Sequence, residues 1–319
     1  MAEAVITLHA RIGKTSPRLP HGIAAANDER ANGRKLRDRL ARVPHAVVLL
    51  LALALALWPH WTWMAQRLTD GSDEPWGVLA LVTTLALIGR EWRKLAVPPR
   101  AALLASAALV LLAAGVRPWV PPLAAATIAM SALALFLAGA RRDRPATALA
   151  SLLLLALPVI ASLQFYFGYP LRLVTAALAA PMLQLLGFGV QATGAALAYE
   201  GRIVLVDPPC AGIGMLWVGA YTAALLSYLN SAPAGRTLLN GAVAAACVFA
   251  ANVARNVVLF FPEGLDLGWP AWTHAAIGLA AFGIALLPVV LFVQRSARAK
   301  PGRRSAPIEW PQRYHRRVV

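Results

Sequence analysis

The sequence has few cysteines and few acidic residues, and both shortages exclude classes of function. Its 319 residues include two cysteines, Cys210 and Cys247, and 14 Asp and Glu together. These two cysteines are far apart in the sequence and do not form the closely spaced pair of a zinc-binding motif. Cys247 also lies within an apolar run, where a free thiol is usually a small core residue. We therefore predict no structural disulfide, no metal site and no cofactor.

Basic residues are abundant, but they gather in two tails instead of spreading over a folded surface. Nine Lys and Arg lie between Arg11 and Arg42, and eight lie between Arg295 and Arg317. A nucleic-acid-binding protein carries its positive charge as a patch or stripe on one face. Clusters beside membrane spans are typical of positive charge retained in the cytoplasm. We therefore predict contact with membrane lipid and no nucleic-acid partner.

Apolar residues make up 59% of the chain and charged residues 14%, which is outside the range of soluble domains. The fold class that follows is an all-α polytopic membrane protein. A helix needs roughly 20 residues to cross the hydrocarbon layer, and eight apolar runs come near that length. These runs are 45–63, 75–89, 97–116, 118–140, 146–164, 211–230, 237–261 and 272–293.

The loops between these runs give one consistent orientation, because Lys and Arg stay on the cytoplasmic side. The loop RLTDGSDEP from Arg67 is mostly acidic and is predicted outside. The basic loops GREWRKLAVPPR from Gly89 and RRDR from Arg141 are predicted inside. With eight spans both basic tails are cytoplasmic, and the outer ends of the last three spans meet on the opposite side.

The apolar segment 171–201 is long enough for a ninth span, but a ninth crossing would reverse the side of one group of basic loops. We therefore predict a broken helix, with Pro181 inside it, that lies in the outer interface or re-enters the membrane. The following residues GRIVLVDP alternate in polarity and predict a short extended segment on the outer face.

Cys210 stands in the stretch VLVDPPCAGIGMLW, between a diproline and an apolar run. Pro208 and Pro209 suit the first turn of a helix, so Cys210 is predicted in the opening turn of the sixth span. Unpaired N–H groups and the positive end of the helix dipole would favour its thiolate there. A buried structural cysteine at a helix start is an equally open alternative.

Two other polar residues are predicted in the same outer leaflet. Arg255 lies within the seventh span between Asn252 and Asn256, where a charge is costly and usually faces a protein interior. His274 lies in the first outer turn of the last span. A snorkelling arginine and a satisfied interfacial histidine are the alternatives. The predicted topology brings Cys210, Arg255 and His274 to the outer leaflet from three helices.

The order and spacing of these residues resemble the exosortase/archaeosortase family. The family's Cys-Ser-Gly-like motif matches Cys210-Ala211-Gly212, its Asn-x-x-Arg motif matches Asn252 to Arg255, and its histidine at the start of the final helix matches His274. The resemblance covers about residues 158–293. Ala211 departs from the serine that is common in the family, and this puts the subfamily in doubt more than the activity.

The resemblance implies a cysteine peptidase or transpeptidase that cleaves C-terminal sorting signals of exported proteins. These substrates carry a Pro-Glu-Pro-like motif, a transmembrane helix and a basic tail. The implied location is the bacterial cytoplasmic (inner) membrane with the active site facing outward. The implied roles are Cys210 as nucleophile, His274 as general acid and Arg255 as oxyanion stabiliser, with Asn252 and Gly212 in support.

The domain organisation follows from the tails, the spans and the resemblance together. We expect a cytoplasmic tail (1–44), an N-terminal transmembrane bundle (45–164), a catalytic membrane region (165–293) and a second tail (294–319). Two alternatives stay open on the sequence alone. One is a transporter or scaffold of envelope polysaccharide export, although no inverted repeat is visible. The other is an inactive relative kept for assembly. Transfer and hydrolysis are also undecided.

Overall fold

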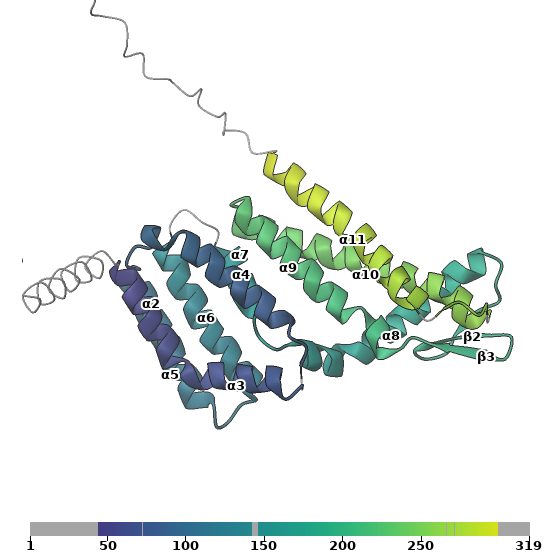
Figure 1. Cartoon of the computed structure of the whole chain (residues 1–319), viewed down its shortest axis with the longest axis horizontal. Coiled ribbons are helices and arrows are strands. Elements are labelled where there is room, and N and C mark those ends of the chain that lie inside the picture. The colour runs from purple at the N-terminus through teal and green to yellow at the C-terminus, as the bar shows by residue number, and fades with distance from the viewer. Residues whose placement is uncertain (1–43, 72, 142–145, 266, 271, 299–319) are drawn as a thin grey trace, which may run out of the picture. The chain divides into compact units, whose positions relative to one another are not determined.

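A computed structural model describes residues 44–71, 73–141, 146–265, 267–270 and 272–298, and the described residues from His45 onward belong to one unit (Figure 1). The two basic tails that the sequence analysis assigns to the cytoplasm lie almost wholly outside the described residues. The basic loop that begins at Arg141 is described only at that first residue.

The first expected span is two helices with a bend between them. Helix α2 (His45–Ala56) and helix α3 (Trp58–Thr69) meet at an angle of 62°. Pro59 stands in the first turn of α3, where its missing N–H costs nothing. A proline there would clash if α2 continued through it, so the chain turns at Leu57.

The remaining helices of the first region are apolar and have 10 to 19 residues. They are α4 (Trp76–Arg90), α5 (Arg100–Val116), α6 (Pro122–Ala140) and α7 (Ala146–Leu155), with a 3₁₀ turn η1 (Trp92–Lys94) after α4. Prolines precede or open α4, α5 and α6, as expected for helix starts. Helix α6 lies between α5 and α7 and buries Ala129, Leu133 and Phe136 in the core of this region.

Helix α8 (Ile160–Leu185) changes two expectations. It meets α7 at 89°, so the expected span 146–164 is broken near Pro158, where a helix cannot readily continue. The expected break at Pro181 does not occur, because α8 runs through Pro170 and Pro181. Helix α8 also crosses the expected domain boundary at 164–165 without interruption.

The chain after α8 forms a three-stranded antiparallel sheet of β1 (Gln191–Ala192), β2 (Ala196–Tyr199) and β3 (Arg202–Leu205). Strand β3 confirms the extended segment expected from GRIVLVDP. Strands β1 and β2 lie in a segment expected to be helical, so that part of the prediction was wrong. Glu200 and Gly201 both have positive φ, which matches a tight two-residue turn between twisted strands.

The last region begins with the 3₁₀ turn η2 (Pro208–Ala211) and continues with α9 (Ile213–Leu229), α10 (Ala234–Gly264) and α11 (Trp272–Arg298). Each of these three helices packs against the other two (Figure 1). Helices α8 and η2 also pack together, which holds the cysteine turn between α8 and α10.

The structure is that of a predominantly helical, multi-pass membrane protein with one small sheet. Three of the described helices, α6, α10 and α11, are long and apolar enough to cross a membrane, and the number rises to five if each bent pair is one span. Helices α4, α5 and α9 are apolar but have 15 to 17 residues. The count of eight spans therefore stays a prediction.

Candidate active site

Three side chains from three elements meet at one point. The Sγ atom of Cys210, in η2, lies 3.6 Å from Nε2 of His274, the third residue of α11. The Nη2 atom of Arg255, in α10, lies 3.1 Å from the same His274 nitrogen. The structure therefore brings together the three residues that the sequence analysis selected, and it confirms His274 in the first turn of the last helix.

The turn that carries Cys210 differs from the prediction. Cys210 lies in the separate 3₁₀ turn η2, where its N–H donates to the carbonyl of Asp207 at 2.8 Å. Gly212 follows with φ of 81°, and α9 begins only at Ile213. The expected place in the opening turn of the long helix was therefore wrong, because the left-handed residue Gly212 separates η2 from α9.

The electrostatic expectation for this thiol was also wrong. Cys210 is 3% exposed, and burial raises the pKa of its thiol above the ordinary value. The Arg255 guanidinium opposes this effect and lowers the pKa of Cys210, while the carboxylates of Asp207 and Glu263 raise it. Burial therefore favours the neutral thiol over the thiolate at this position.

Two asparagines of α10 hold the backbone of Cys210. Asn252 donates its Nδ2 hydrogen to the Cys210 carbonyl at 2.9 Å, and Asn256 donates to the same oxygen at 3.4 Å. Asn256 also donates to the Asn252 carbonyl at 2.8 Å. Asn256 was noted in the sequence but was not selected as a site residue, although its spacing of four residues from Asn252 places both side chains on one face of the helix.

Gly212 is required by its conformation and by its neighbour. A Cβ atom at this position would lie 2.7 Å from Cγ of Asn252, and the positive φ disfavours any side chain. The close approach lets the amide of Asn252 reach the Cys210 carbonyl. The expected supporting roles of Asn252 and Gly212 thus correspond to a single contact between η2 and α10.

Arg255 is 8% exposed and packs against Gly278 of α11. A Cβ atom at Gly278 would lie 3.2 Å from Nε of Arg255, so the glycine makes room for the flat guanidinium. The Nε atom itself is buried and has no hydrogen-bond partner among the described residues. Arg255 therefore lies inside the protein against α11, and this burial contradicts the alternative of a side chain that snorkels to the surface.

The sequence analysis missed Glu263, in the last turn of α10. Its Oε1 atom lies 3.2 Å from Nδ1 of His274, on the side of the ring that faces away from Cys210. The sequence contains one signal for it, an acidic residue near His274. Glu263 and Asp266 are the two acidic residues between Arg255 and His274. Spacing alone could not choose between them.

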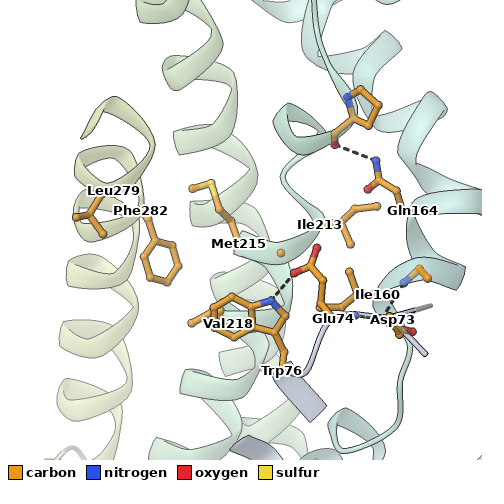
Figure 2. Close-up of a pocket in the computed structure, with 14 residues that line it drawn as sticks. Asp73, Glu74, Trp76, Ile160, Gln164, Ile213, Met215, Val218, Leu279 and Phe282 are labelled. Carbon is orange, nitrogen blue, oxygen red and sulfur yellow. Dashed lines mark hydrogen bonds between the residues drawn. The ribbon is translucent and has the colours of Figure 1, made fainter. Parts of the chain in front are cut away.

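A cavity of about 700 Å³ adjoins the cysteine turn (Figure 2). Its wall includes Pro208 and Ile213, which stand on either side of Cys210 in the chain, and Phe282 of α11. The loop before α4 contributes Glu74, and Gln164 of α8 donates to the Pro208 carbonyl at 2.8 Å. Among the described residues no group of three His, Cys, Asp or Glu is arranged to hold a metal ion.

The family model of the transmembrane exosortases (EpsH) matches residues 39–291, which is most of the chain and includes Cys210, Arg255 and His274. No curated protein and no solved structure matches the chain. Since the match covers well over half of the sequence, the chain belongs to the transmembrane exosortase family.

Proposed function

We propose that this protein is a cysteine transpeptidase or peptidase that cleaves C-terminal sorting signals of exported proteins at the outer surface of the bacterial inner membrane. The observation that carries the proposal is the contact of the Cys210 thiol with Nε2 of His274, beside the guanidinium of Arg255. A thiol, a base and a fixed cation are the parts that acyl transfer by a cysteine requires.

The first step is proton transfer from Sγ of Cys210 to Nε2 of His274. The resulting thiolate attacks the carbonyl carbon of the scissile peptide bond, a C–S bond forms, and the carbonyl electron pair moves to oxygen. Arg255 stabilises this oxyanion, because its guanidinium lies next to the reacting atoms and is always charged. The burial that raises the pKa of Cys210 makes His274 necessary as the base.

The second step breaks the C–N bond. The oxyanion collapses, the amine leaves with the proton held on Nε2 of His274, and a thioester on Cys210 remains. Water or an acceptor amine then attacks the thioester and releases the thiol. Nε2 of His274 both accepts the proton and returns it. No atom changes its oxidation state during the cycle, so the proposed reaction requires no cofactor.

The cavity beside η2 fits the substrate class that family membership suggests, a Pro-Glu-Pro-like motif followed by a transmembrane helix and a basic tail. On α11 the cavity is lined by Leu279 and Phe282, which follow His274 by five and eight residues, so they lie about 8 and 12 Å along this helix from the histidine. A substrate helix anchored in the same membrane would have its first turns at this depth.

Co-expression with a protein that ends in such a sorting signal tests the proposal. We expect the C-terminal tail to be removed by the native chain and by Cys247→Ala, because Cys247 packs in a separate apolar cluster of α9, α10 and α11. We expect Cys210→Ala to accumulate normally and to leave the substrate intact. Full processing by Cys210→Ala would overturn the proposal, and equal loss from both cysteine variants would indicate a folding defect.

A further inference from the structure

We infer that Glu263 is a positioning residue of this site, which fixes the tautomer of His274 and stabilises its protonated form. The inference rests on the proposed function and adds a fourth residue to it. Glu263 lies in the last turn of α10, two turns beyond Arg255, and its carboxylate reaches the ring nitrogen that the thiol does not use.

The hydrogen bonds around His274 determine which nitrogen carries the proton. Arg255 can only donate, so the Nε2 atom that lies 3.1 Å from its Nη2 must accept. In the neutral ring the hydrogen is then on Nδ1, where it is donated to Oε1 of Glu263 at 3.2 Å. In this tautomer Nε2 has a single lone pair that both Arg255 and the Cys210 thiol face, so Nε2 accepts the thiol proton when its hydrogen bond from Arg255 breaks.

The charges around His274 show why the carboxylate is needed. When Nε2 takes the proton from Cys210, the ring becomes a cation beside the guanidinium of Arg255. Two adjacent positive charges oppose that transfer, whereas the carboxylate of Glu263 on the other side of the ring favours it. Cys210, Arg255 and Glu263 are the ionisable groups in contact with this ring among the described residues, and the Asp207 carboxylate acts on the thiol.

Glu263 also has a direct effect on the thiol, and this effect has the opposite sign. Its negative charge raises the pKa of Cys210 and so disfavours the thiolate. Removal of the charge would therefore speed thiolate formation if Glu263 acted on Cys210 alone. It would slow the reaction if Glu263 acted mainly through His274, so the sign of the change distinguishes the two routes.

Alkylation of Cys210 by iodoacetamide measures this sign without any sorting-signal substrate. The full chain carries Cys247→Ala, so that Cys210 is its single thiol. At pH 7 we expect Glu263→Gln to slow alkylation about tenfold. This is far less than the loss seen when a buried catalytic carboxylate is replaced. The side chains of His274 and Glu263 are each 41% exposed, and solvent weakens the interaction between their charges.

The decisive comparison repeats the substitution in His274→Ala, where the route through the ring is absent. There Glu263→Gln should leave alkylation unchanged or make it faster, so the two effects differ in sign. Glu263→Asp keeps the charge but shortens the side chain, and we expect an intermediate rate. Glu200→Gln is the matched control, because it removes one carboxylate at the exposed β2–β3 turn, away from His274. We expect this variant to be alkylated at the parent rate.

Slower alkylation in both backgrounds would indicate a structural role for Glu263 and would overturn the inference. Faster or unchanged alkylation with His274 present would also overturn it, because Glu263 would then act on the thiol directly or not at all. Neither result would contradict the proposed function, because that proposal is tested separately by the loss of substrate processing in Cys210→Ala.

Discussion

The helices before and after the α7–α8 bend bury polar side chains in different ways. In the first region, α2–α7, the core is mostly Ala and Leu with Met and Phe136, and two of its buried polar side chains have partners within the same region: Thr84 donates to the Ala80 carbonyl, and Arg141 pairs with Glu91. In the last region, buried asparagines and an arginine of α10 form one connected set of contacts with the cysteine turn.

This difference predicts which amino-acid substitutions each region tolerates. Apolar side chains in lipid gain little from burial itself, so the first region depends on shape and close packing, which conservative substitutions can retain. Buried polar networks have specific partners, and loss of one member leaves the others unsatisfied. We therefore expect changes in the first region to alter stability and changes in the last region to alter turnover.

The largest contrast should come from one substitution made at two glycines. Gly212→Ala introduces strain at a positive φ and pushes Asn252 away from the Cys210 carbonyl, so processing should fall about a hundredfold. Gly115→Ala, in α5, has no neighbour within 4 Å of its new Cβ and should process normally. Equal rates for the two variants, measured by tail removal, would show that the contact with Asn252 does not orient the thiol.

A smaller loss is expected when the charge of Arg255 is kept but its shape is changed. Arg255→Lys cannot reproduce the flat guanidinium that packs over Gly278, so we expect at least tenfold slower processing with normal accumulation. His274→Ala should be slower still, by about a hundredfold, because the base for the thiol is lost. Near-native turnover of the lysine variant would remove Arg255 from the mechanism.

The pH dependence of Cys210 alkylation should change in opposite directions for two neighbours. Arg255 lowers the pKa of Cys210, so Arg255→Gln should move alkylation to higher pH. Asp207 raises that pKa, so Asp207→Asn should move alkylation to lower pH. Both are measured with iodoacetamide in the Cys247→Ala protein. Shifts in the same direction would mean that the substitutions change access to the thiol instead of its charge environment.

The smallest effect on turnover is expected from a substitution that creates a cavity in the core of the first region. Leu137 of α6 is 1% exposed, and Leu137→Ala should lower the free energy of unfolding by about 1–3 kcal/mol, the packing part of the usual cost. Processing per folded molecule should not change. Thermal unfolding in detergent and tail removal measure the two quantities, and a tenfold loss of turnover at normal accumulation would contradict the division into two regions.

The helical, membrane-embedded class of the fold could be predicted from the sequence, because long apolar runs must satisfy their own backbone hydrogen bonds in lipid. The bends at Leu57 and Pro158 and the β1–β2 pairing could not. An apolar run looks the same whether it crosses the membrane straight, bends at a proline or ends in a hairpin. The packing partners of each segment decide among these outcomes, and they lie far away in the chain.

Cys210, Arg255 and His274 could be selected from the sequence alone, because a charge within an apolar helix is costly and rare, and because a thiol and an imidazole near the ends of two other apolar runs complete the motifs of a known family. Their chemistry depended on the tertiary structure. The 3₁₀ turn before Gly212, the burial that raises the pKa of the thiol, and the contact of Glu263 with the second nitrogen of His274 all arise from distances between η2, α10 and α11. Hydrogen bonds and charge effects change over a few ångströms, and residue spacing along the chain does not set positions between helices that finely.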